Sequence, residues 1–272
     1  MTHELTVSLL NIDRAALTIE VLESLAVLSG EGWLIQLVLV DNGSRADELT
    51  MLRDWVAATR SRFEEVVFVE SPENLGVSGG RNLALARASH DRLLILDNDV
   101  VLPEGRHWLT QLARTMDMEP RSGIVAPMLV FADRPDTVQA TGIGLTKTGR
   151  VGYLNRNRLA ASIASTVLDV VAAPAACWLV RRDAQRAVGL FSEMYHPMQY
   201  EDVDFCLRLR VAGWTVLCDP SVRIAHIENV TTRSLTGHAF ARTSVRNAML
   251  FREKWSDLLP DVATLTEDDI SW

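Results

Sequence analysis

Apolar, strand-like runs alternate with helix-like segments through the first hundred residues of this chain, and that order constrains the fold more than any other feature. The apolar runs typical of strands are Leu5–Leu10, Leu34–Val40, Val66–Val69 and Leu93–Leu96. Helical patterns separate them, at about Arg14 to Leu28, Ala46–Thr59 and Ser78–Ala88. The resulting β-α-β-α-β-α-β order predicts an α/β fold with a mostly parallel sheet and helices on both of its faces.

The second half of the chain has a less regular pattern. Strands are expected over Ser122–Val130, Val170–Val180, Thr215–Cys218 and Val222–Ala225. A glycine-containing hairpin is expected over Thr137–Tyr153, a loop or short helix over Arg156–Thr166, and helices over Glu201–Ala212 and Phe240–Trp255. No repeat, low-complexity tract or linker marks a boundary. We therefore expect one domain over residues 1–234, with a helical C-terminal extension over 235–272 packed on it.

Composition narrows the class of protein. A net charge of −8 argues against nucleic acid as a partner, although a metal ion can still accompany a nucleotide ligand. Three scattered cysteines form neither a disulfide framework nor a CxxC metal motif, which favours a reducing compartment. The longest apolar run, Val170–Val180, contains Pro174 and is too short to cross a bilayer. With no leader pattern at the N-terminus, we expect a cytoplasmic protein without a transmembrane segment.

Acidic side chains follow two of the predicted strands directly. Asp41 follows Leu34–Val40, and Asp97-Asn98-Asp99 follows Leu93–Leu96. Parallel sheets bind ligands beyond the carboxyl ends of their strands, and two carboxylates one residue apart suit a divalent ion that also binds phosphates. The alternatives are a polar turn for Asp97–Asp99 and a helix cap for Asp41.

A glycine-rich segment, Gly76–Asn82, joins a predicted strand to a helix and contains Gly79 and Arg81. Backbone N–H groups and the helix dipole at such a junction favour phosphate, and Arg81 would add positive charge. A dinucleotide-binding unit is the alternative, but the glycine spacing does not fit GxGxxG.

Further candidates lie in the second half. In a helix that begins near Glu201, Asp202 shares a face with Phe205, whereas Asp204 and Arg208 form a surface ion pair on another face. Asp202 is thereby a candidate general base, or else a carboxylate that stabilises the helix N-terminus. His226 follows an apolar strand and is either a metal ligand or a structural hydrogen-bonding residue.

In their order along the chain, these segments resemble family 2 glycosyltransferases of the Rossmann-like GT-A fold, especially the bacterial rhamnosyltransferase-like branch. The resemblance spans roughly Leu5 to His226 and rests on five motifs. These are the N-Y-N-R-type strand end in Val7–Arg14, the V-D-N-G-S segment in Leu37–Ser44, the N-L-G-x-x-G-G-x-N segment in Asn74–Leu83, the DXD strand Leu94–Asp99, and the G-x-F-D-E…E-D-V-D block in Val188–Glu193 and Glu201–Asp204.

The resemblance implies inverting, Mn²⁺- or Mg²⁺-dependent transfer from a nucleoside-diphosphate sugar, with UDP favoured over dTDP and GDP. The acceptor could be a glycan, a lipid, a peptide or a small metabolite. The implied roles are nucleobase contact for Asp41, ribose contact for Asp97, metal binding for Asp99 and His226, general base for Asp202 and acceptor-side shaping for Glu201. The other implied donor-binding residues are Asn11, Asp13, Arg14, Asn74, Gly79, Arg81, Asn82 and Asn98.

Two other functions stay open at this point. A GT-A-like nucleotidyltransferase would activate a sugar phosphate with a nucleoside triphosphate, but the N-terminal region lacks the glycine-rich, basic triphosphate loop that such an enzyme needs. A degenerate nucleotide-sugar-binding module would not need to keep both DXD carboxylates and Asp202. Homodimer formation also stays open.

Overall fold

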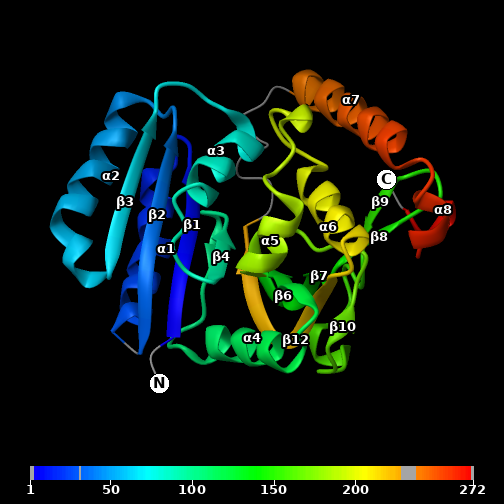
Figure 1. Ribbon diagram of the computed structural model, residues 1–272, viewed down its shortest axis with the longest axis horizontal. Helices are drawn as coiled ribbons and strands as arrows, with labels where there is room; N and C mark the ends of the chain where they lie inside the picture. Colours follow the sequence, from blue (N-terminus) through cyan, green and yellow to red (C-terminus); the bar gives the residue numbers. More distant parts are fainter. Residues whose placement is uncertain (1–2, 31, 228–236, 271–272) are drawn as a thin grey trace.

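The computed structural model describes residues 3–30, 32–227 and 237–270 (Figure 1). The predicted alternation is present in its first half. The elements are β1 His3–Asn11, α1 Ala15–Ser29, β2 Trp33–Asn42, α2 Ala46–Thr59, β3 Glu65–Ser71, α3 Gly76–Leu85 and β4 Arg92–Leu96. Strands β4, β1, β2 and β3 lie side by side and all run parallel, so their carboxyl ends meet at one edge of the sheet.

The second half extends this sheet with strands of both directions. Its elements are β5 Val100–Val101, α4 His107–Met118, β6 Ser122–Phe131, β7 Arg134–Ala140, β8 Ile143–Leu145, β9 Val151–Tyr153, β10 Leu168–Asp169, β11 Cys177–Arg181, α5 Arg182–Val188, α6 Glu201–Val211, β12 Thr215–His226, α7 Gly237–Trp255 and α8 Leu259–Val262. The strand order is β10-β12-β6-β11-β4-β1-β2-β3. The three longest ladders join parallel strands, whereas β11 is antiparallel to both of its neighbours.

Three expectations for the second half need correction. The run Val170–Val180 is a strand only from Cys177, because the residues before it include Pro174, which has no N–H to donate to a ladder. The two strands expected near residues 215–225 are one strand, β12, with an irregular register between Asp219 and Arg223. The hairpin is confined to β8 and β9, and β7 pairs instead with β6.

Helices cover both faces of the sheet because its strands alternate apolar side chains between the two faces. Leu94 and Leu96 of β4 pack into one cluster with residues of α1, α2 and α4. Leu93 and Ile95, one residue out of phase, pack into a second cluster with residues of α3, α5 and α6. This period of two places one core against each face of a single sheet and buries its central strands.

The C-terminal helices pack on the second of these clusters. Phe251 of α7 and Leu259 of α8 are buried in it together with Trp178 of the central sheet. Figure 1 shows α7 running above α6. The predicted boundary at residue 234 lies outside the described residues, and within the described part no helix has the length and apolarity needed to cross a membrane.

Candidate active site

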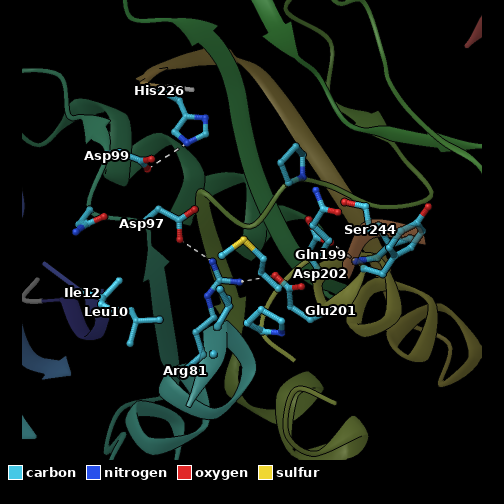
Figure 2. A pocket seen from close by; sticks show the side chains of 18 of the residues that line it. Leu10, Ile12, Arg81, Asp97, Asp99, Gln199, Glu201, Asp202, His226 and Ser244 are labelled. Carbon is cyan, nitrogen blue, oxygen red and sulfur yellow. Dashed lines mark hydrogen bonds and ion pairs between the residues drawn. The ribbon is translucent and has the colours of Figure 1, made fainter. Parts of the chain in front are cut away.

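A cavity of about 590 Å³ opens at the carboxyl ends of β1, β2 and β4 (Figure 2). Leu10 and Ile12 line it from the end of β1, and Asp97 and Asp99 line it from the turn after β4. The start of α6 and the end of β12 complete its wall, with Glu201, Asp202 and His226 as members of that lining. The predicted edge of the parallel sheet is therefore where the candidate residues gather.

Asp97, Asp99 and His226 form a cluster that is able to hold a metal ion. One ligand atom from each side chain lies within 4.8 Å of the others. His226 Nε2 is 3.1 Å from Asp99 Oδ1, while Nδ1 is 2.8 Å from Oε1 of Gln139. In the tautomer with its hydrogen on Nδ1, His226 would donate to Gln139 Oε1 and turn the Nε2 lone pair toward a metal ion held with Asp99.

Arg81 links this cluster to the start of α6. Its side chain is 4% exposed, and Nη2 donates to Asp97 Oδ1 at 2.6 Å, while Nη1 lies 3.8 Å from Glu201 Oε1. Burial raises the pKa of Asp97, although the Arg81 charge partly opposes this. Among the described residues, Arg81 Nε and Nη1 and Glu201 Oε2 have no hydrogen-bond partner. Buried polar atoms normally have hydrogen-bond partners, so these three atoms stand out beside the cavity, although Nη1 keeps its ion pair with Glu201.

Glu201 and Asp202 begin α6 and face the cavity. Burial, followed by the charge of Asp202, raises the pKa of Glu201 to about 7. Burial also raises the pKa of Asp202, and the hydrogen bond from the backbone N–H of Val203 partly opposes the rise. Both carboxyl groups therefore titrate closer to neutral pH than an exposed carboxylate does, as suits a group that takes up a proton.

The predicted division of α6 into an inward and an outward face is wrong in one respect. Asp204 does pair with Arg208, at 2.9 Å between Oδ2 and Nε, but Asp204 has no exposed surface. Its Oδ1 also accepts hydrogen bonds from Tyr195, Lys254 and Trp255. The C-terminal helix covers the face that the sequence pattern assigned to solvent.

A comparison with known protein families identifies the family of this chain. The model of the family described as "Glycosyl transferase family 2" matches residues 12–188, which is more than half of the chain. The chain belongs to glycosyltransferase family 2. The match includes the Asp97–Asp99 turn and ends before Glu201, Asp202 and His226. The assignment of those three residues to the site therefore rests on their positions in the cavity lining.

One curated relative of this family 2 chain is the pre-mycofactocin glycosyltransferase of Mycobacterium tuberculosis (strain CDC 1551 / Oshkosh). It is 29% identical over 192 residues, covering 71% of this chain and 37% of the relative. Across the curated relatives that it matches, the chain spans 21% to 44% of their length.

Two solved structures share the fold. GalNAc-T7, crystallised with UDP, GalNAc and Mn²⁺, has a TM-score of 0.72 at 14% identity, over 96% of this chain and 49% of that one. The mannosyltransferase of Pyrobaculum calidifontis, in complex with GDP-Man and Mn²⁺, has a TM-score of 0.64 at 18% identity, over 96% and 69%. The predicted GT-A fold is thereby confirmed.

The predicted donor-binding residues of this family 2 chain divide into two sets. Those that line the cavity are Asp13, Arg14, Asn74, Arg81, Asp97 and Asn98. Those that do not line it are Asn11, Asp41, Gly79 and Asn82. Asp41 has no exposed surface, and the Asn82 amide is hydrogen-bonded to the backbone of Phe191. In this second set the polar groups are used to hold neighbouring loops.

Several cavity residues had no sequence signal. Gln139 belongs to no motif, and it meets His226 because β7 and β12 pair with β6 on its two edges. Phe240 and Ser244 line the cavity from α7, a helix with no motif of its own. Their positions depend on how distant elements pack, which no local pattern indicates.

Proposed function

We propose that this family 2 chain transfers a sugar from a nucleoside-diphosphate sugar to an acceptor nucleophile, with a divalent metal ion and with inversion at the anomeric carbon. One observation carries the proposal: the Asp97–Asp99–His226 cluster and the Asp202 carboxylate share one cavity, joined by Arg81. The solved neighbours described with UDP or GDP-Man and Mn²⁺, and the curated glycosyltransferase relative, support it.

The donor end of the cavity is assigned by its chemistry. Two carboxylates and an imidazole form a donor set that suits Mn²⁺ or Mg²⁺, and the contact between Gln139 Oε1 and His226 Nδ1 is the kind of outer hydrogen bond that orients a metal-binding histidine. Asp99 and His226 would hold the ion, which neutralises the charge that develops on a departing diphosphate. Leu10, Ile12 and Asn74 would then line the place of the nucleoside.

The residues of this chain supply the rest of the reaction. As the acceptor oxygen or nitrogen forms its bond to the anomeric carbon, Asp202 accepts the acceptor proton. The bond between that carbon and the diphosphate oxygen breaks, and its electron pair leaves with the diphosphate. Attack opposite the leaving group inverts the configuration. Arg81 Nη1 and Glu201 Oε2, which form no hydrogen bond among the described residues, would orient sugar hydroxyls between these groups.

A thermal-shift screen tests the donor assignment. UDP, dTDP and GDP are added with and without Mn²⁺, and we expect UDP with Mn²⁺ to stabilise the protein most. A ligand present at 100 times its Kd adds about 2.7 kcal/mol to the free energy of unfolding. The Asp99→Asn variant should lose the Mn²⁺-dependent part of that gain. Stabilisation by nucleoside triphosphates with a sugar phosphate, but by none of the diphosphates, would favour a nucleotidyltransferase instead.

A second measurement tests the chemistry. NMR of the product anomeric configuration reports inversion, and the Asp202→Asn variant should bind nucleoside diphosphate normally while its transfer rate falls by about 10² or more. Full activity of a folded Asp202→Asn variant would assign the base elsewhere.

A further inference from the structure

The side chain of Asn247 reaches from the middle of α7 to the loop before α6. Asn247 has no exposed surface. Its amide Nδ2 donates hydrogen bonds to the backbone oxygens of Tyr195 at 2.7 Å and Met198 at 2.8 Å, with Gln199 O at 3.3 Å. A single buried amide therefore ties together three carbonyl groups of one loop.

The neighbouring Arg246 binds the same loop from the solvent side. Its Nη1 donates to His196 O at 2.9 Å and its Nη2 to Met194 O at 3.3 Å. Together Arg246 and Asn247 engage backbone carbonyls along residues 194–199, so the path of this loop is fixed by α7.

The loop ends in a backbone conformation that its side chains do not favour. Gln199 and Tyr200 have φ angles of 79° and 73°, in the left-handed region that residues with a Cβ rarely adopt. Neither residue is a glycine or an asparagine. Such a turn persists where the surroundings determine it, and here the bonds from α7 supply that constraint.

This turn decides where α6 begins. Tyr200 is the residue before the helix, and Glu201 and Asp202 follow it at once. Figure 2 shows Gln199, Glu201 and Asp202 grouped at one side of the cavity, next to Ser244 of α7. A change of φ at residues 199 and 200 would turn the first residues of α6 away from their present direction.

Helix α7 also contacts the residues that lie two positions before and two positions after Asp202. Lys254 Nζ and Trp255 Nε1 lie 2.6 Å and 3.0 Å from Oδ1 of Asp204, and the Tyr200 ring packs on Phe251 at 5.0 Å between centroids. The start of α6 therefore contacts α7 through Tyr200, which precedes the proposed base, and through Asp204, which follows it.

We propose that Asn247 is a positioning residue, which holds the left-handed Gln199–Tyr200 turn so that the Asp202 carboxylate faces the anomeric carbon. The inference rests on the proposed function, because it takes Asp202 as the base. Asn247 lies beyond the part of the chain that the family model matches, and its role follows from its contacts with this loop.

The test compares Asn247→Ala with Gln185→Ala. Gln185 is a matched control, because its side chain is 5% exposed and its amide donates to Gly189 O at 2.9 Å, away from the cavity. The assay needs no acceptor. UDP-glucose, UDP-N-acetylglucosamine, dTDP-rhamnose and GDP-mannose are each incubated with Mn²⁺, and hydrolysis is followed as nucleoside diphosphate released. Water forms the new bond to the anomeric carbon, and its proton goes to Asp202.

We expect Asn247→Ala to lower the hydrolysis rate by about 10- to 100-fold, since a misplacement of about 1 Å costs up to that much. Its affinity for nucleoside diphosphate with Mn²⁺, measured by calorimetry, should stay within twofold, and Gln185→Ala should match the wild type. In an Asp202→Asn background, Asn247→Ala should cause no further loss, because both changes remove the same step. An equal loss in both backgrounds would overturn the inference.

Hydrogen exchange provides a readout that does not depend on activity. The amides of residues 194–202 should exchange faster in Asn247→Ala than in Gln185→Ala, while those of β4 stay unchanged. Unchanged exchange in that segment also overturns the inference. If Asn247→Ala does not fold, Arg246→Ala, at an exposed position, is measured in the same way. If the wild type hydrolyses none of these donors, the exchange result alone decides whether α7 holds this loop, and the thermal-shift screen with Mn²⁺ decides the proposed function separately.

Discussion

Asp41 lies at the end of β2 with no exposed surface, and both of its carboxylate oxygens accept hydrogen bonds from the protein itself. Oδ1 accepts from the Asn11 amide at 2.9 Å, and Oδ2 accepts from the backbone N–H of Ser44 at 3.0 Å. The Asn11 amide oxygen accepts from Thr18, which in turn accepts from Asn98. At the scale of single residues, this chain of bonds explains why polar side chains occur at strand ends without lining the cavity.

Asp41→Ala should lower the free energy of unfolding by about 1–3 kcal/mol, because it removes the buried acceptor of the Asn11 amide and of the Ser44 N–H and hydroxyl. Urea denaturation measures the change. Asp47, whose side chain is 75% exposed on α2, provides the control, and Asp47→Ala should stay within about 0.5 kcal/mol of the wild type. A stability change as small as that at position 41 would show that the network is dispensable.

Gln139 Oε1 lies 2.8 Å from His226 Nδ1 and would orient the imidazole toward a metal ion, so Gln139→Leu should weaken Mn²⁺ binding. Loss of such a partner typically lowers metal affinity by about 10- to 100-fold. Calorimetric titration with Mn²⁺ and UDP measures it. Gln185→Leu, on a helix that does not line the cavity, should bind as the wild type does. Equal Mn²⁺ affinity in both variants would show that Gln139 does not support metal binding by His226.

The raised pKa of Glu201 predicts a pH dependence of stability. The folded protein prefers the neutral carboxyl, with a pKa of about 7 against the ordinary value of 4.5. This preference adds stability in full below pH 4.5, and the added stability is lost as the pH rises through about 7. Between pH 5 and 8 the loss amounts to about 2–3 kcal/mol. Denaturation of Glu201→Gln at both pH values should lack this loss, and an equal loss in the variant would assign it to another group.

At the scale of elements, the glycines of α3 allow close packing of the backbone. Gly76 has a φ of 70°, and a Cβ there would lie 2.7 Å from the backbone oxygen of Pro197. The adjacent Val77 N–H donates to that same oxygen at 2.7 Å. A Cβ on Gly79 would lie 2.7 Å from Leu75 Cβ. The glycine-rich segment thus brings α3 against the loop that precedes α6.

Gly76→Ala and Gly105→Ala separate conformation from packing. Both glycines have a φ of 70°, but a Cβ at Gly105 would meet nothing within 4 Å. Gly105→Ala should cost about 1–2 kcal/mol, the penalty of the left-handed conformation alone. Gly76→Ala should cost at least 1 kcal/mol more, because a backbone atom has to move. Chemical denaturation of both variants measures the difference. An equal loss of unfolding free energy in the two variants would mean that the backbone near Pro197 can move to accommodate the new Cβ.

At the scale of the whole molecule, the C-terminal helices form one hydrophobic core with the sheet. Phe251 has no exposed surface and belongs to the cluster that contains Trp178 and Phe205. Helix α7 also lines the cavity through Phe240 and Ser244. The predicted extension is therefore both part of the core and part of the wall of the site.

Phe251→Ala should destabilise the whole protein by about 3–5 kcal/mol, the cost of a large cavity in a core. Unfolding should remain one transition when followed by tryptophan fluorescence and by circular dichroism. Met249, 64% exposed on the same helix, provides the control, and Met249→Ala should change stability by less than about 0.5 kcal/mol. Two separate transitions would indicate that α7 folds independently of the sheet.

The sequence by itself determined the parallel half of the sheet and the position of the site at its carboxyl edge. Leu93–Leu96 and Leu37–Val40 are apolar on both faces, and the segment Asp97–Asp99 follows the first of them at once. Local periodicity specifies such strands, and the sheet rules then place their ends together. The bounds of α2 agree with the prediction for the same reason.

Only the tertiary structure decided which polar residues face the cavity. Asp41 and Asp97 both follow buried strands, yet Asp41 is enclosed by Asn11 and Ser44 while Asp97 faces Arg81 and the cavity. Burial depends on neighbours that are distant in the chain, so a strand-end carboxylate looks the same in the sequence in either case. The same holds for Asn247, whose hydrogen bonds to residues about 50 positions earlier exist only once α7 has packed on the loop before α6.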